Sequence, residues 1–352
     1  MEEQIRRRIQ IAIKEKLFPG CVVGVIRTNG EGMVLAYGRH TYTKSSKPMR
    51  VDSVFDVASI TKAIPLAAVT LSLAEQGTLD LDEPIATYLP DFDTSPDKRL
   101  VTLRHLLTNS VDLAILPLSW LKNEPPQSII KTVCEAPLKA LPGTVYKYTN
   151  TSALLLSLYL MKVSPISLGV LAKRLYFDPL GMHDSSFSPH KDGRIVPTEI
   201  DPWRARKIEG EVHDESTYVL QQLYGENCIG TAGLFSTVPD LLRFVEMLLR
   251  DGKLYGIQYF KEETVRAMHT DHFPKAGGAG GLGWTLYPQD FMGKHGTPTM
   301  FGKTGFTGCM IMIDRSKERG LVILSNYHYP RRKTDLLPNK KFRADMCDIV
   351  FG

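Results

Sequence analysis

The stretch DVASITKAIPLAAVTLSLAEQG, residues 56–77, changes from an extended pattern to a helical one at Ser59. β-formers precede Ser59, an apolar run with helical spacing follows it, and Gly77 suits the position just after a helix. Ser59 is therefore predicted at a helix N-terminus, where free backbone N–H groups and the positive end of the helix dipole favour a developing negative charge. Lys62 follows three residues later, on the same face of that helix.

The spacing of Ser59 and Lys62 does not by itself identify a nucleophile and its base. A serine at a helix N-terminus is ordinarily a capping residue, and a lysine in the first turn is ordinarily solvated. The same S-x-x-K pattern begins at four other serines, which are Ser95, Ser119, Ser128 and Ser188. Partners from elsewhere in the chain are needed to choose among them.

Two further motifs supply such partners. The chain contains one Y-x-N, Tyr148 to Asn150, ahead of a helical pattern, and one K-T-G, Lys303 to Gly305, on a predicted strand. A lysine can deprotonate a serine only when burial or a second cation lowers its pKa, and Lys303 would be that cation. Lys303 would also favour the phenolate of Tyr148, and with the Thr304 hydroxyl it could bind a substrate carboxylate. Gly305 would let a substrate backbone approach the strand closely.

Strand patterns occur at both ends of the chain. CVVGVIR and MVLAYG flank an Asn-Gly turn and predict a β-hairpin, while GWTLY, CMIMID and LVILSNY predict strands near the C-terminus. The sequence therefore predicts an α/β (α+β) fold with a largely antiparallel sheet built from residues 1–56 and 276–352 and covered by terminal helices. The mainly helical region 57–275, carrying Ser59, Lys62 and Tyr148, is inserted between the halves of the sheet. We expect one structural unit with the active site at the junction.

The three motifs, in this order and on these elements, resemble those of the penicillin-recognising serine hydrolases. A second motif that begins with tyrosine resembles the branch that contains class C β-lactamases, related DD-peptidases and family VIII carboxylesterases. The chain has no S-D-N motif, which disfavours the class A arrangement. The segments 73–92, 101–110 and 232–249 are also similar to that family. The resemblance implies a β-lactamase/transpeptidase-like fold and singles out Ser59 from the other four serines.

The resemblance also implies a role for each site residue. Ser59 would be the nucleophile and Lys62 its base or base partner. Tyr148 would exchange protons with the leaving group and activate the deacylating water, and Asn150 would hold Lys62 and the substrate amide. The backbone N–H groups of Ser59 and Phe306 would form the oxyanion hole.

Three departures from the family pattern affect the expected shape of the pocket. Residues 109–113 lack the usual glycine, and the segment 220–235 is longer and bulkier than expected. Pro65 stands inside the predicted nucleophile helix, where it removes a backbone hydrogen bond.

Composition and charge exclude several classes of protein. The chain has 352 residues, of which 43% are hydrophobic and 23% charged, enough for a sizeable core. The net charge of +5 is mild and the basic runs lack interleaved aromatics, so no nucleic-acid partner is expected. Five cysteines without a C-x-x-C predict reduced thiols rather than disulfides. The N-terminus does not resemble a signal peptide and no long apolar run occurs, so we expect no membrane span and a cytoplasmic location.

Neither a metal nor a cofactor is predicted. The glycine-rich stretch GGAGGLG contains G-x-G-x-x-G at Gly278, Gly280 and Gly283, but a strand pattern follows it instead of a helix. The run His213 to Glu215 lacks matched ligands at metal-binding spacing. We expect this run to form a polar network that braces the wall of the cleft.

Three hypotheses for function remain open, all with a small molecule as partner and with the oligomeric state undetermined. The first is an acyl-serine hydrolase of carboxylate-bearing amides, such as β-lactams or D-alanyl peptides, which Lys303 and Thr304 favour. A cytoplasmic enzyme of this kind would act on recycled cell-wall fragments. The second is a carboxylesterase of small esters, and the third is a penicillin-binding or sensing protein that is acylated without turnover.

Overall fold

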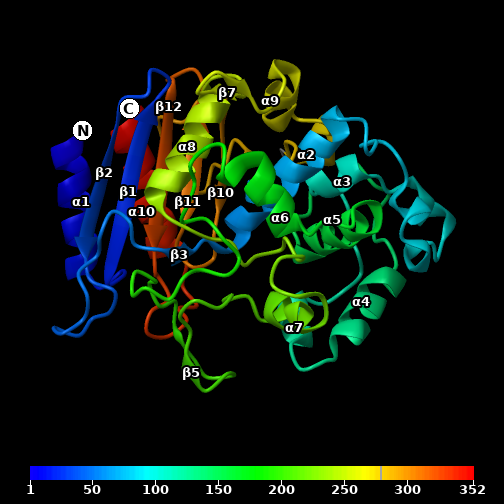
Figure 1. Ribbon diagram of the computed structural model, residues 1–352, viewed down its shortest axis with the longest axis horizontal. Coiled ribbons are helices and arrows are strands. Elements are labelled where there is room, and N and C mark those ends of the chain that lie inside the picture. Colours follow the sequence, from blue (N-terminus) through cyan, green and yellow to red (C-terminus); the bar gives the residue numbers. More distant parts are fainter. Residues whose placement is uncertain (278–279) are drawn as a thin grey trace.

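The computed structural model describes residues 1–277 and 280–352, and an antiparallel sheet forms its centre. In the described residues this sheet has six strands, in the order β2-β1-β12-β11-β10-β9. The N-terminal hairpin therefore lies beside the last strand of the chain, which confirms a sheet built from both chain ends (Figure 1). The strands of the sheet are β1 (Gly20–Arg27), β2 (Gly32–Gly38), β9 (Thr285–Leu286), β10 (Met300–Thr304), β11 (Met310–Asp314) and β12 (Arg319–Ser325).

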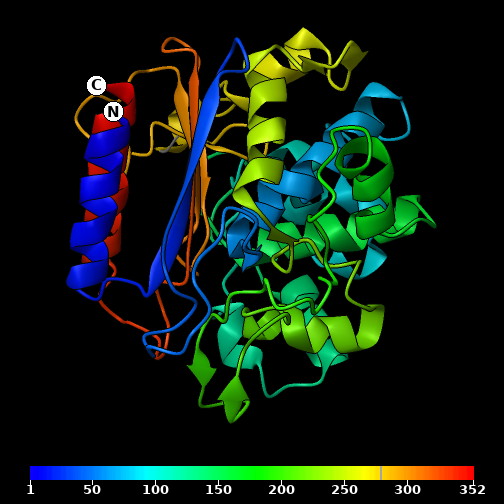
Figure 2. The same ribbon diagram turned by 60° about the vertical axis from the view of Figure 1, so that its left-hand side comes forward.

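Helices cover both faces of the sheet. Figure 2 shows α1 and α10 side by side on one face and α8 on the other. The terminal helices were predicted to cover the sheet, whereas α8 comes from the middle of the chain. Glycines allow α8 to pack closely, because a Cβ on Gly24 would lie 2.4 Å from Val238 Cγ1 and one on Gly320 would lie 2.1 Å from Val245 Cγ1. These three helices are α1 (Glu2–Lys14), α8 (Val238–Leu249) and α10 (Leu337–Phe351).

The remaining helices pack beside the sheet and form the mainly helical region (Figure 1). Their bounds are α2 (Ala68–Glu75), α3 (Leu103–Leu107), α4 (Pro126–Glu135), α5 (Asn150–Val163), α6 (Leu168–Ala172), α7 (Glu215–Tyr224) and α9 (Glu262–Met268). Two-stranded pairs join loops of this region: β3 (Phe55–Asp56) with β6 (Phe235–Ser236), β4 (Ile200–Asp201) with β5 (Arg206–Lys207), and β7 (Lys253–Leu254) with β8 (Ile257–Gln258). The domain boundaries at residues 57 and 276 stay a prediction.

The nucleophile segment is not the continuous helix that the sequence predicts. A tight 3-10 turn spans Ala58–Lys62, Ile64 has a non-helical backbone with φ of −123° and ψ of 107°, and the α-helical part begins only at Ala68. Proline lacks a backbone N–H and disfavours helical geometry in the residue before it, so Pro65 explains the break.

One helical stretch of the described residues, 58–75, is long and apolar enough to cross a membrane by length and composition. Its surroundings are protein, since 83% of it is buried inside the fold. The core helix of a globular domain meets the same criteria. All five cysteines are free, as predicted.

Candidate active site

A cleft of about 450 Å³ opens where the sheet meets the helical region. The catalytic motifs converge on it. Ser59 comes from the turn before α2, Tyr148 and Asn150 come from the start of α5, and Thr304 comes from the end of β10. The junction predicted from the sequence therefore holds a cleft that brings the three motifs together.

A buried carboxylate fixes the turn that carries Ser59. Asp56 accepts hydrogen bonds from the backbone N–H of Ala58 at 2.8 Å and from that of His213 at 2.7 Å. Ala58 has a positive φ of 49°, which turns the chain sharply just before Ser59. Burial raises the pKa of Asp56, and these two backbone donors oppose the rise. The motifs in the sequence do not identify Asp56, although an acid three residues before Ser59 is close enough to bind the backbone of the turn that carries the serine.

Lys62 lies beside the hydroxyl of Ser59. Its ammonium donates to Ser59 Oγ at 2.9 Å and to the carbonyl oxygen of Thr231 at 2.6 Å. The lysine is 6% exposed, so the carbonyl of Thr231 replaces the water that burial removes. Sequence reasoning did not identify Thr231, because a backbone acceptor leaves no mark on residue type.

Tyr148 lies between two ammonium groups. Lys303 Nζ is 4.8 Å and Lys62 Nζ 5.6 Å from the centroid of its ring. Burial alone would raise the pKa of Tyr148, but both charges and hydrogen bonding with Ser59 and Lys62 outweigh it, so the pKa lies below its ordinary value of 10. The side chain is 42% exposed, and a substrate in the cleft can therefore reach it. The phenolate of Tyr148 is thus easier to form than that of a free tyrosine.

Lys303 is a buried cation on β10, and its side chain makes no ion pair with an acid in the described residues. Burial lowers its pKa to about 8, a shift that Tyr148 opposes and Lys62 reinforces. The next residue, Thr304, is partly exposed and lines the cleft. Thr304 thus offers its hydroxyl to the cleft, whereas Lys303 lies beside the ring of Tyr148 and is not one of the lining residues. The Lys303 ammonium has no acidic partner in the described residues, which suits an anion that reaches it.

Gly305 allows close packing inside the protein. A Cβ at this position would lie 2.3 Å from the carbonyl oxygen of Val57, so the missing side chain brings β10 against the nucleophile segment. Gly305 also lines the cleft, and the close approach of a substrate backbone to it stays a prediction. Arg343 of α10 holds the same turn from behind, donating to the carbonyl oxygens of Gly305 at 2.9 Å and Cys309 at 2.8 Å.

A profile of the β-lactamase family matches residues 5–343. The chain belongs to the β-lactamase family. The resemblance seen in the sequence is thereby confirmed, and the chain is a serine hydrolase of this family.

Curated relatives of this β-lactamase-family chain are named as a carboxypeptidase and an amidase. A putative D-alanyl-D-alanine carboxypeptidase of Escherichia coli is 27% identical, over 85% of this chain and 75% of the relative. An N-acetylmuramyl-L-alanine amidase of Bacillus subtilis is 24% identical, over 88% of this chain and 77% of the relative.

Solved structures show the same fold at low sequence identity. EstCE1, a hydrolase with promiscuous acyltransferase activity, aligns with a TM-score of 0.76 at 19% identity, covering 100% of this chain and 98% of that one. A class C β-lactamase from Rhodobacter sphaeroides aligns with a TM-score of 0.72 at 19% identity, covering 99% of this chain and 100% of that one. These likenesses confirm the predicted β-lactamase/transpeptidase-like fold.

Asn150 departs from the role that the family resemblance implies. Its side-chain amide donates to Asp214 Oδ2 at 3.1 Å, and the described structure records no hydrogen bond from it to Lys62. Asp214 caps α7 and also accepts from Ser216 and Thr217. Burial would raise the pKa of Asp214, yet these hydrogen bonds and the charge of Lys62 lower it. Asn150 therefore contacts the carboxylate of Asp214, whose pKa responds to the charge of Lys62.

The run from His213 to Glu215 forms the polar network predicted for the cleft wall. Arg332 donates to Glu199 Oε1 at 2.7 Å and to Glu215 Oε1 at 2.8 Å, and His213 Nε2 lies 3.0 Å from Glu199 Oε1. Burial would raise the pKa of Glu199, but His213 and Arg332 lower it to about 2. Arg332 is thus shared between the two carboxylates of this wall, Glu199 and Glu215.

Phe306 follows the turn at Gly305, and its backbone N–H has no acceptor in the described residues. Both Ser59 and Phe306 line the cleft. The predicted oxyanion hole, made by their two N–H groups, stays a prediction that this placement allows.

The described residues contain no group of three or more His, Cys, Asp or Glu side chains arranged to hold a metal ion. Of the glycine-rich motif, Gly278 lies outside the described residues. Gly280 forms a β-bridge with Thr285, and a Cβ on Gly283 would lie 2.3 Å from Ala67 Cβ. The described part bends at residues 282–284, where Gly283 has a φ of 87°, and packs against the nucleophile segment, so it does not open a helix as a dinucleotide motif would.

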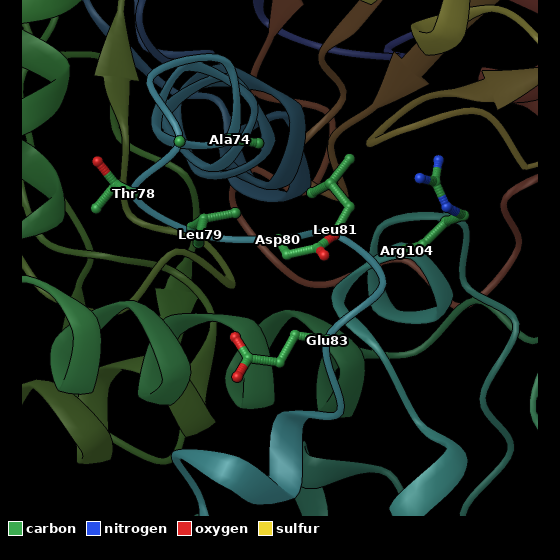
Figure 3. A pocket seen from close by; sticks show the side chains of 8 residues that line it. Ala74, Thr78, Leu79, Asp80, Leu81, Glu83 and Arg104 are labelled. Atoms are coloured by element: carbon green, nitrogen blue, oxygen red, sulfur yellow. The ribbon is translucent and has the colours of Figure 1, made fainter.

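A second hollow, of about 570 Å³, lies after α2 (Figure 3). Figure 3 shows Asp80, Glu83 and Arg104 around it. Glu83 accepts from Tyr159 at 3.3 Å, and Arg104 donates to Asp82 through Nε and Nη2. The hollow has no nucleophile with an adjacent base, so it is not the active site.

Proposed function

We propose that the protein hydrolyses its substrates through an acyl-enzyme on Ser59. The observation that carries the proposal is the 2.9 Å contact of Lys62 Nζ with Ser59 Oγ, beside a tyrosine whose pKa is lowered by two lysines. Ser59 Oγ attacks the substrate carbonyl carbon, and its proton passes to the Lys62–Tyr148 pair. The N–H groups of Ser59 and Phe306 stabilise the oxyanion, each typically contributing ~3–4 kcal/mol.

Tyr148 completes both half-reactions in this scheme. In acylation the phenol donates its proton to the leaving group as the bond between the carbonyl carbon and the leaving group breaks. In deacylation the phenolate takes a proton from water, whose oxygen attacks the acyl carbon and releases Ser59. One group thus acts as acid and then as base, which requires a pKa near the working pH.

The substrate class that we propose is an amide with a nearby carboxylate, of the β-lactam or D-alanyl peptide type. Lys303 and Thr304 supply an ammonium and a hydroxyl without an acidic protein partner. The names of the curated relatives support amides of the cell wall, since both describe enzymes that cleave bonds next to alanine.

A carboxylesterase is the second candidate. The esterase-like neighbour EstCE1 favours it, although at 19% identity this likeness establishes only the fold. A penicillin-binding protein that is acylated without turnover is the third candidate.

The test is a parallel comparison of kcat/KM on nitrocefin, on a peptide ending in D-Ala-D-Ala and on p-nitrophenyl esters. Faster turnover of the carboxylate-bearing amides supports the proposal. Turnover of esters alone replaces it with the second candidate, and a stable adduct on Ser59 without turnover replaces it with the third.

A further inference from the structure

The side chain of Phe306 forms an aromatic surface inside the cleft. It is 42% exposed, whereas most large apolar side chains of the sheet region are buried. One face of its ring stacks on His328, with centroids 4.1 Å apart and planes inclined by 21°. The guanidinium carbon of Arg332 lies 5.5 Å from the centroid of the same ring. An exposed phenyl ring held in this way is available for contact with a ligand.

The groups behind Phe306 hold the ring in place and cannot bind a substrate anion themselves. His328 is buried, and its Nδ1 accepts from the backbone N–H of Lys333 at 3.0 Å. Burial lowers the pKa of His328 to about 3, so the imidazole is neutral. Arg332 already binds Glu199 and Glu215 with its terminal nitrogens. His328 and Arg332 are therefore already hydrogen-bonded within the protein, and the exposed part of the Phe306 ring is left for contact with a ligand.

The position of Phe306 relative to the reaction decides which part of a substrate would meet it. Its backbone N–H is one of the two proposed oxyanion donors, and its side chain lines the same cleft as Ser59. The leaving group departs towards Tyr148, which belongs to the helical region. The opposite side of the cleft, which is lined by Phe291 and the 38%-exposed Leu336 and also by the charged Asp290, Lys340 and Arg343, is left for the acyl group.

We propose that Phe306, supported by His328 and Arg332, forms an acyl subsite that selects substrates with a flat aromatic group one carbon from the reacting carbonyl. This inference rests on the proposed acyl-enzyme mechanism and adds to it the chemical class of the acyl group. It also gives the polar network around His213 a function, which is to fix Arg332 beside the phenyl ring.

The test compares p-nitrophenyl phenylacetate with p-nitrophenyl acetate, which share a leaving group and differ by one phenyl ring. Phe306→Leu keeps the backbone N–H and an apolar side chain but removes the aromatic plane. The ratio of kcat/KM for phenylacetate to that for acetate should fall about 2- to 12-fold, the range expected for one aromatic pair. An unchanged ratio overturns the proposal.

Phe273→Leu is the matched control, because Phe273 is partly exposed and stacks on His105 at 4.8 Å without lining the cleft. Its ratio should stay at the wild-type value, and an equal fall in both variants overturns the proposal.

A second measurement needs no variant. Benzylboronic acid should inhibit the wild type more strongly than methylboronic acid, and equal inhibition constants also contradict the subsite. Failure of the mechanism itself would appear differently, as esterase activity that persists in Ser59→Ala.

Discussion

Replacing Lys303 with alanine should separate the two substrate classes. Lys303 is 2% exposed, its Nζ lies 4.8 Å from the centroid of the Tyr148 ring, and the described residues offer it no acidic partner. On a neutral ester the variant loses only the influence of this charge on Tyr148 and Lys62. On a substrate with a carboxylate it loses in addition a charge-assisted hydrogen bond.

The size of that additional loss follows from the strength of such a bond. A hydrogen bond to a charged group contributes about 1.5–3 kcal/mol, which corresponds to about 10- to 150-fold in kcat/KM. The assay is kcat/KM for wild type and Lys303→Ala on one carboxylate-bearing and one neutral substrate of similar intrinsic reactivity. Lys340→Ala is the matched control, because Lys340 lines the same cleft but is already paired with Asp290 at 2.6 Å.

The ratio of kcat/KM for the carboxylate-bearing substrate to kcat/KM for the neutral one should also depend on pH in the wild type. The pKa of Lys303 is lowered to about 8, so the ammonium is charged at pH 7 and largely neutral near pH 9.5. The preference for the carboxylate-bearing substrate should therefore decline as pH rises through about 8, and it should be flat in Lys303→Ala. Equal losses on both substrates, or a preference independent of pH, refute carboxylate recognition by Lys303 and favour the esterase hypothesis.

Further substitutions probe the rest of the site. Ser59→Ala should abolish turnover with the fold intact, and intact-mass spectrometry should find a fluorophosphonate adduct on the wild type only. Tyr148→Phe should lower kcat by ~10²–10⁴ and remove a pH-dependent limb that lies below pH 10; near-normal turnover would make Tyr148 a packing residue. Gly305→Ala should cost about 1–3 kcal/mol in urea unfolding and reduce kcat, because its Cβ meets the Val57 carbonyl; an unaffected variant refutes that close packing. Lys303→Met should raise the free energy of unfolding at pH 7 by up to about 3 kcal/mol, because burial lowers the pKa of Lys303 from 10.5 to about 8 and so destabilises its charged form. The gain should shrink as the pH rises from about 8 to about 10.5, and a variant without any gain at pH 7 contradicts the cost of burying this charge. An adduct on any of the other S-x-x-K serines would refute the assignment of the nucleophile: Ser95, Ser119, Ser128 or Ser188.

The sequence predicted the catalytic motifs and the sheet because both depend on residue type and spacing. Alternating and continuous apolar runs identified the strands, and the Asn-Gly turn identified the hairpin of β1 and β2. Ser59, Lys62 and Tyr148 meet in the cleft because each belongs to a motif at the edge of a predicted element. The position of the cleft follows from the same topology.

Other features depend on contacts that residue type does not reveal. The amphipathic pattern of α8 predicts a buried face but does not say that this face meets the sheet. Asn150 binds Asp214 only because α7 is placed opposite α5, and Thr231 contributes a carbonyl that any residue would carry. The apolar pattern around Pro65 predicts a continuous helix, but proline disfavours helical backbone in the residue before it. The helix is therefore broken at Ile64.

The two sides of the cleft fit different parts of a substrate, namely its acyl group and a carboxylate on its leaving group. The Lys303 side carries positive charge at pH 7 that no acid of the described residues neutralises, and a buried uncompensated charge is costly. The Phe306 side offers an exposed phenyl ring, and the Arg332 guanidinium beside that ring is already paired. A substrate with an aromatic acyl group and a carboxylate on its leaving group satisfies both sides at once. A simple ester of a neutral alcohol contacts only the Phe306 side and leaves Lys303 without a partner. The arrangement of charge therefore favours substrates that carry a carboxylate, and the response of Lys303→Ala to substrate charge tests that preference directly.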